Sequence, residues 1–166
     1  MTDLKRFSAS AIPADLRQPA WNEILSRLGL ASDAASSIRN DDSGHMALSV
    51  STRDSVFVQL TATPQILSPI VAKANQPLQG TVLVLALLDG TAQVLDAEQT
   101  VKLRSGDIML LDPSQSWRLA LQTSFRIMLI KLESSSFLLR LVRTGRQEAN
   151  RISTQQGIGA LCLNML

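Results

Sequence analysis

Between residues 46 and 132 the chain repeats short apolar or alternating runs, and turn residues separate each run from the next. The clearest unit is 103–113, which has the pattern of a strand, a tight Gly106-Asp107 turn, a second strand and a stop. The unit 84–95 has the same form around Asp89-Gly90. Further strands are expected at 46–52, 55–63, 65–72, 82–88, 117–122 and 125–132. Short strands joined by hairpin turns predict a mainly β protein, either a sandwich or a barrel.

Alternation within single strands predicts which side chains face inward. In 117–122 the apolar residues Trp117, Leu119 and Leu121 share one face, so this face is expected inside and Arg118 outside. The run 82–88 is continuously apolar, which is typical of a strand buried on both faces. Pro69 interrupts 65–72, so this segment is expected at a sheet edge.

Apolar residues at helical spacing predict helices at both ends of the chain. A first helix is expected from Pro19 to a stop at Gly29, after an N-terminal arm of residues 1–18. Two further helices are expected within 134–166, and both carry an apolar stripe. These stripes contain Leu138, Leu141, Ile158, Leu161, Cys162 and Met165. The second stripe still continues at residue 166, so the sequence is expected to belong to a longer protein.

Composition indicates one globular domain with an aliphatic core. Hydrophobic residues make up 45% of the 166 residues, whereas aromatic residues make up only 4%. The formal net charge of +2, with scattered Lys and Arg, gives no case for nucleic-acid binding. A single cysteine, Cys162, excludes an intrachain disulfide and suits a reducing compartment. With no signal-peptide or membrane-span pattern, a cytoplasmic location is expected.

The residues that carry catalytic chemistry are few and far apart. The single histidine, His45, is expected at the surface, in a turn before the first strand of the region 46–132. One histidine and one distant cysteine give no nucleophile-base pair. Asp107 and Asp112 flank one strand and are interpreted as turn residues. We therefore expect no catalytic residue, no metal and no cofactor.

The order of these units resembles the N-terminal regulatory domain of AraC/XylS-type transcription regulators, a cupin-like barrel. The resemblance covers roughly residues 15–166 and is sharpest at Gly106-Asp107, Leu110-Leu111-Asp112 and Ser116-Trp117. The chain departs from the family at Glu133, where members commonly have proline. Cupin enzymes hold a metal with three histidines and a glutamate. The corresponding positions here are approximately Pro77, Gln79, Leu83 and Arg118, and none of these side chains replaces an imidazole or carboxylate ligand.

The resemblance implies a fold and a function. The fold is a cupin-like barrel at 19–133 with a leading helix, followed by a two-helix dimerisation segment at 134–166. The function is to sense a small effector, to mediate homodimerisation, or both, while DNA is bound only by a C-terminal domain absent from this chain. In the cupin register Arg118 would point inward and anchor a ligand carboxylate, against the alternation argument. The predicted effector-lining residues are Leu83, Leu85, Met109, Leu111, Trp117, Arg118 and Met128. The alternatives are a small cupin-like enzyme or isomerase without the usual metal site, and a purely structural dimerisation barrel.

Overall fold

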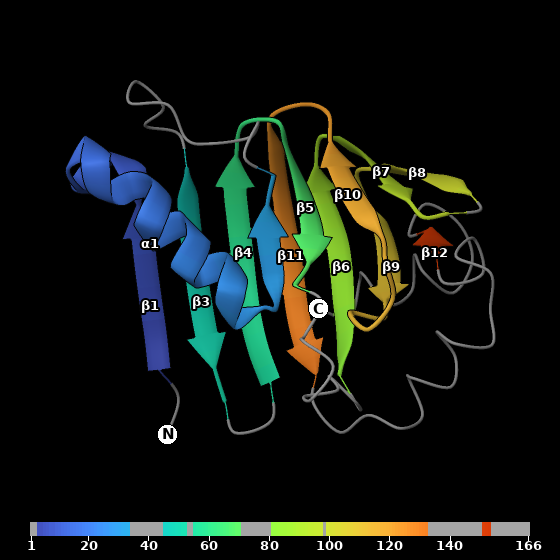
Figure 1. Cartoon of the computed structure of the whole chain (residues 1–166), viewed down its shortest axis with the longest axis horizontal. Coiled ribbons are helices and arrows are strands. Elements are labelled where there is room, and N and C mark those ends of the chain that lie inside the picture. The colour runs from blue at the N-terminus through green and yellow to red at the C-terminus, as the bar shows by residue number, and fades with distance from the viewer. Residues whose placement is uncertain are drawn as a thin grey trace.

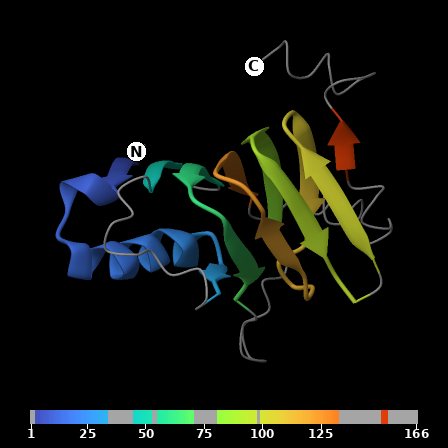
Figure 2. The same cartoon turned by 90° about the horizontal axis from the view of Figure 1, so that it is seen from above.

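The computed structural model describes residues 3–33, 45–52, 55–70, 81–97, 99–132 and 151–153. Two antiparallel sheets form two layers, and the helix α1 (Ala14–Arg27) lies on the same side as the smaller sheet (Figures 1 and 2). The seven-stranded sheet has the order β1 (Asp3–Ser8), β3 (Met46–Ser51), β4 (Ser55–Ala62), β11 (Phe125–Leu132), β6 (Val82–Asp89), β9 (Asp107–Leu111) and β12 (Arg151–Ser153). The five-stranded sheet has the order β2 (Leu30–Ser32), β5 (Gln65–Pro69), β10 (Arg118–Leu121), β7 (Thr91–Leu95) and β8 (Thr100–Arg104). This confirms the predicted mainly β fold.

Glycine turns lie at the two expected positions, Gly90 and Gly106, but they do not form the expected hairpins, because the strands that each turn joins belong to different sheets. Both residues have positive φ angles, +97° and +90°, which residues with a side chain rarely adopt. A Cβ atom at Gly90 would also lie 2.8 Å from the carbonyl oxygen of Ser124. The local sequence therefore fixes both turns, and each turn carries the chain from one sheet to the other: from β6 to β7 at Gly90, and from β8 to β9 at Gly106.

One hydrophobic core joins the two sheets and the helix. The facing sides of the strands interleave Leu, Val, Ile and Ala side chains, as period-2 alternation requires. Trp21 and Leu25 of α1, and Leu28 at its C-cap, belong to the same cluster. The helix thus closes the side of the sandwich where β1 and β3 lie (Figure 1), as its stripe predicted.

The N-terminal region differs from its prediction in two ways. The helix begins at Ala14, so that Pro19 lies inside it and not at its first position. A proline there removes one intrahelical hydrogen bond, but the buried Trp21 and Leu25 hold the helix against the core. The expected N-terminal arm instead forms β1, which pairs with β3 along its whole length.

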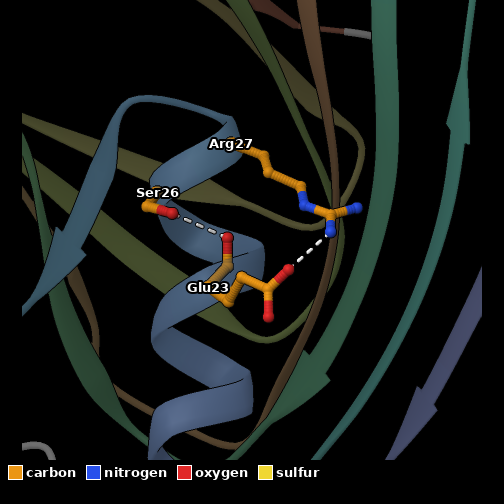
Figure 3. A network of polar contacts seen from close by, with 3 residues as sticks. All are labelled: Glu23, Ser26 and Arg27. Atoms are coloured by element: carbon orange, nitrogen blue, oxygen red, sulfur yellow. Dashed lines mark hydrogen bonds and ion pairs between the residues drawn. The ribbon is translucent and has the colours of Figure 1, made fainter.

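The outward side of α1 is polar and carries a small network (Figure 3). Glu23 and Arg27 form an ion pair at 2.5 Å, one helical turn apart. The Ser26 hydroxyl donates to the backbone carbonyl of Glu23 at 2.8 Å. Because these side chains are exposed, the network adds little stability and marks a solvated surface.

The segment expected at a sheet edge, β5, lies instead between β2 and β10, because the unpredicted strand β2 pairs with its free side. Pro69 is the last residue of β5. The strand β12 was not predicted either. The two C-terminal helices lie outside the described residues. Within the described ranges no helix is long and apolar enough to cross a membrane.

Candidate functional site

Five of the predicted effector-lining residues meet inside the sandwich. Leu83 pairs with Leu111, and Leu85 pairs with Met109, on the adjacent strands β6 and β9. Trp117 is also buried in the same core cluster, and its indole Nε1 donates to the backbone carbonyl of Asp112 at 2.9 Å. Register therefore brings the four residues of β6 and β9 together, and Trp117 belongs to the same hydrophobic core.

This part of the interior is tightly packed. Leu83, Leu85 and Met109 are 0% exposed, so no part of these residues is accessible to water. Leu111 is 2% exposed and Trp117 is 3% exposed. A ligand at this position would have to displace buried side chains, and such a rearrangement of a close-packed core lowers the stability of the fold. The geometry here is that of a core which holds two sheets together.

Two of the predicted lining residues do not face the interior. Arg118 is exposed and forms an ion pair with Asp33 at 2.8 Å on the outside of the five-stranded sheet. The alternation argument for 117–122 is thereby confirmed, and the inward cupin register of Arg118 is wrong. Met128 lies between the buried Ile127 and Leu129 on β11, so it points to the outer face of the seven-stranded sheet, where it is half-buried.

The positions that correspond to the cupin metal ligands do not assemble a ligand set. Leu83 is in the core and Arg118 is outside, whereas Pro77 and Gln79 lie outside the described residues. Across the described part of the chain, no group of three or more His, Cys, Asp or Glu side chains is placed to hold a metal ion.

A buried polar cluster lies beneath α1, and the sequence did not reveal it. The Trp21 indole Nε1 donates to Gln65 Oε1 on β5 at 3.1 Å. The ring of His45 packs edge-on against Trp21 with a centroid distance of 5.0 Å, and Phe7 stacks at 5.9 Å in a tilted geometry. His45 is 1% exposed, so its expected surface position is wrong. The reason is tertiary, because the packing of α1 covers a residue that the local sequence places in a turn.

Gln65 is a buried polar residue of this cluster whose hydrogen-bonding capacity is only partly used. Its side chain is buried, and its Nε2 has no hydrogen-bond partner among the described residues. A buried amide without a partner costs about 1–3 kcal/mol. No sequence signal marks the pair, since Trp21 and Gln65 are 44 residues apart. The amide oxygen of Gln65 can be buried because it accepts a hydrogen bond from the Trp21 indole on the neighbouring helix.

The two aspartates interpreted as turn residues have that role, and one has a second role. Asp112 accepts hydrogen bonds from the backbone N–H and the hydroxyl of Ser114. Asp107 accepts from the Arg104 backbone N–H at 2.9 Å. The buried Asp107 carboxylate also pairs with Arg151 on β12, with Nε and a terminal nitrogen at 3.1 and 2.9 Å. This ion pair ties the last described strand to β9.

The predicted dimer-interface residues lie outside the described residues. Leu138 and Leu141 follow β11, and Ile158, Leu161, Cys162 and Met165 follow β12. The structure fixes the points from which both segments leave: the end of β11 and the two ends of β12, all on the seven-stranded sheet.

A protein-family model described as the AraC-binding-like domain matches residues 68–166, which is more than half of the chain. This chain belongs to that family. The expectation of a cupin-like regulatory domain of an AraC-type regulator is therefore confirmed. Comparison with curated proteins gives no match.

Solved structures resemble this AraC-binding-like domain in fold. The AraC-like transcriptional activator CuxR superposes with a TM-score of 0.69 at 12% identity, over 98% of this chain and 58% of that chain. The EutQ protein of Clostridium difficile gives a TM-score of 0.44 at 9% identity, over 67% and 73%. An oxalate decarboxylase gives 0.41 at 14% identity, over 64% and 30%. The domain thus spans 58% of the length of the CuxR chain that it matches.

Proposed function

We propose that this AraC-binding-like domain holds two copies of a transcription regulator together. DNA is bound by another part of the protein, in the cytoplasm. The observation that supports dimerisation best is where the chain leaves the seven-stranded sheet. Residues 133–150 connect the end of β11 to β12, which lies three strand positions away in the sheet. That gap is about 14 Å at a strand spacing of roughly 4.8 Å, and the segment is much longer than the gap requires.

The stripe that contains Leu138 and Leu141 is the part we assign to the contact between copies. The segment has spare length, so these side chains can reach a second molecule while both of its ends stay fixed on the sheet. Burial of paired leucine stripes is a common source of dimer affinity.

Light scattering across a dilution series tests the dimer. We expect the unmodified chain to be a dimer that dissociates on dilution. Leu141→Gln should be monomeric at concentrations where the unmodified chain is dimeric. Arg140→Gln, a neighbouring change off the stripe, serves as the matched control and should remain dimeric. A monodisperse monomer at high concentration for the unmodified chain would contradict the proposal.

Effector sensing is the second function that we propose, and one observation favours a location for it. The inner face of β6 and β9 is fully buried in the core, whereas the cluster beneath α1 contains the Gln65 amide, whose Nε2 has no hydrogen-bond partner among the described residues. An effector that offers a hydrogen-bond acceptor would compensate this group if α1 moved away. Substitution of Gln65 by Met should then abolish the effector response of the full-length regulator without abolishing its dimerisation.

A further inference from the structure

The outer face of the seven-stranded sheet carries two rows of side chains in cross-strand register. The first row is entirely apolar and consists of Val50, Phe57, Ile130, Val84 and Leu110. The second row contains one polar residue and consists of Leu48, Gln59, Met128, Ala86, Ile108 and Ile152. Together the rows run without a break from β3 to β12, so the apolar character is continuous across the sheet.

These rows are not covered by the rest of the described structure. Leu48, Phe57 and Ile152 are 43%, 37% and 42% exposed, and the other members are half-buried. A sheet face that is exposed to water normally alternates to polar residues, and large apolar patches mark contact sites. The strand β3 even turns its apolar side, Met46 and Leu48, outward and its small Ala47 inward. The continuously apolar run in β6, expected to be buried on both sides, likewise leaves Val84 and Ala86 half-exposed.

The position of β12 suggests which segment of the chain covers this face. Ile152 is itself the last member of the second row, and the chain leaves β12 at Ser153, on the edge of the sheet (Figure 2). The ion pair of Asp107 and Arg151 fixes this exit point. Residues 154–166 follow directly and carry the stripe of Ile158, Leu161, Cys162 and Met165. A segment tethered this close has a high effective concentration over the face.

The dimensions of the segment and the face agree. Four strand steps separate β12 from β4 in the sheet, which corresponds to about 19 Å at roughly 4.8 Å per step. A helix of residues 154–166 would be about 20 Å long at roughly 1.5 Å per residue. We propose that residues 154–166 pack their apolar stripe across this outer face of their own chain and form a third layer on the sandwich.

The single cysteine of the chain provides a direct test. Three single variants, Ala86→Cys, Ile108→Cys and Met128→Cys, place a second thiol on neighbouring strands of the second row. Disulfides require Cα atoms about 4.4–6.8 Å apart, and neighbouring strands are roughly 4.8 Å apart. The three positions therefore sample the row closely. Matched controls, Gln93→Cys and Ala120→Cys, are paired residues that face outward on the other sheet.

After mild oxidation of dilute full-length chain, we expect an intrachain disulfide between Cys162 and at least one row-two position, and none in the controls. Peptide mapping and non-reducing electrophoresis identify the product. Disulfides mainly between chains would show that a second copy supplies the segment, and would overturn the proposal. Failure of all three row-two variants to form the bond would overturn it as well.

A second measurement guards against loss of the fold. In Leu161→Ser, a dye that binds exposed apolar surface should fluoresce several-fold more strongly, while the far-ultraviolet circular dichroism of the sheets is retained. The matched change Asn164→Ser, off the stripe, should leave the dye signal unchanged. An equal signal in both variants would contradict a covered face. The light-scattering test with Leu141→Gln concerns only the dimer. Either proposal can therefore fail without affecting the other.

Discussion

At the residue scale, Gln65 shows how one buried amide can be both useful and costly. Its Oε1 accepts the hydrogen bond of the Trp21 indole, which helps to hold α1 on β5. Its Nε2, on the same side chain, has no partner within the described residues. The helix is thus attached by a contact whose net stabilisation is smaller than its geometry alone suggests.

The pair can be tested with a double-mutant cycle. Gln65→Met removes the amide but leaves the buried indole N–H without an acceptor, so we expect a loss of about 1–3 kcal/mol in the free energy of unfolding. Trp21→Phe leaves Oε1 unpaired, removes ring volume and should cost a comparable amount. The double variant should be more stable than the sum of the single losses predicts, by on the order of 1 kcal/mol. Urea titrations measure all three, and strictly additive losses would argue that the two side chains do not interact.

At the element scale, β12 is a short strand that an ion pair links to β9 in addition to its backbone pairing. It contributes three residues to the sheet, and such a strand has few backbone hydrogen bonds of its own. The Asp107 carboxylate is 2% exposed while the Arg151 side chain is 37% exposed, so the pair is only partly screened by water.

Loss of this ion pair should release the strand. In Arg151→Gln we expect amide hydrogen exchange at Ile152 to become faster by about 10- to 100-fold, since charge-assisted hydrogen bonds contribute roughly 1.5–3 kcal/mol. Asp107→Asn should have a similar effect. Asp112→Asn is the control, because that side chain bonds Ser114 at the other end of β9. Unchanged exchange in Arg151→Gln would mean that the backbone pairing alone holds β12.

The sequence predicted those elements whose pattern is local. The turns at Gly90 and Gly106 follow from turn chemistry, and the faces of β10 follow from alternation. The hairpins expected at these turns were wrong, because local turn chemistry does not show which sheet the next strand joins. The short strands β2 and β12 contain too few residues for a periodic pattern. The burial of His45 and the pairing of Trp21 with Gln65 arise from contacts between distant segments. Much of the candidate site was therefore beyond prediction, because the site is made by the packing of a helix.

At the scale of the whole molecule, one core connects both sheets and α1. Trp21 lies beneath the helix and Trp117 precedes β10, yet both belong to the same buried cluster. Small domains with a single core usually unfold in one cooperative step. The two tryptophans are thus natural probes of two regions of one unit.

Single-tryptophan variants test this cooperativity. In Trp117→Phe only Trp21 reports, and in Trp21→Phe only Trp117 reports. Within each variant, the urea midpoint from fluorescence should equal the midpoint from far-ultraviolet circular dichroism, even though both variants are less stable than the parent chain. A fluorescence transition of Trp21 that precedes the dichroism transition would show that α1 detaches before the sheets unfold.

The position of β11 in the sheet has a consequence for biosynthesis. This strand pairs with β4 on one side and β6 on the other, although it is made from residues 125–132. On the ribosome, β4 therefore keeps an unpaired edge until more than sixty later residues have been synthesised. Exposed edges of apolar strands invite pairing with other chains. The nascent protein thus exposes the edge of a half-built sheet until β11 has been synthesised, and of the described strands only β12 comes later in the chain.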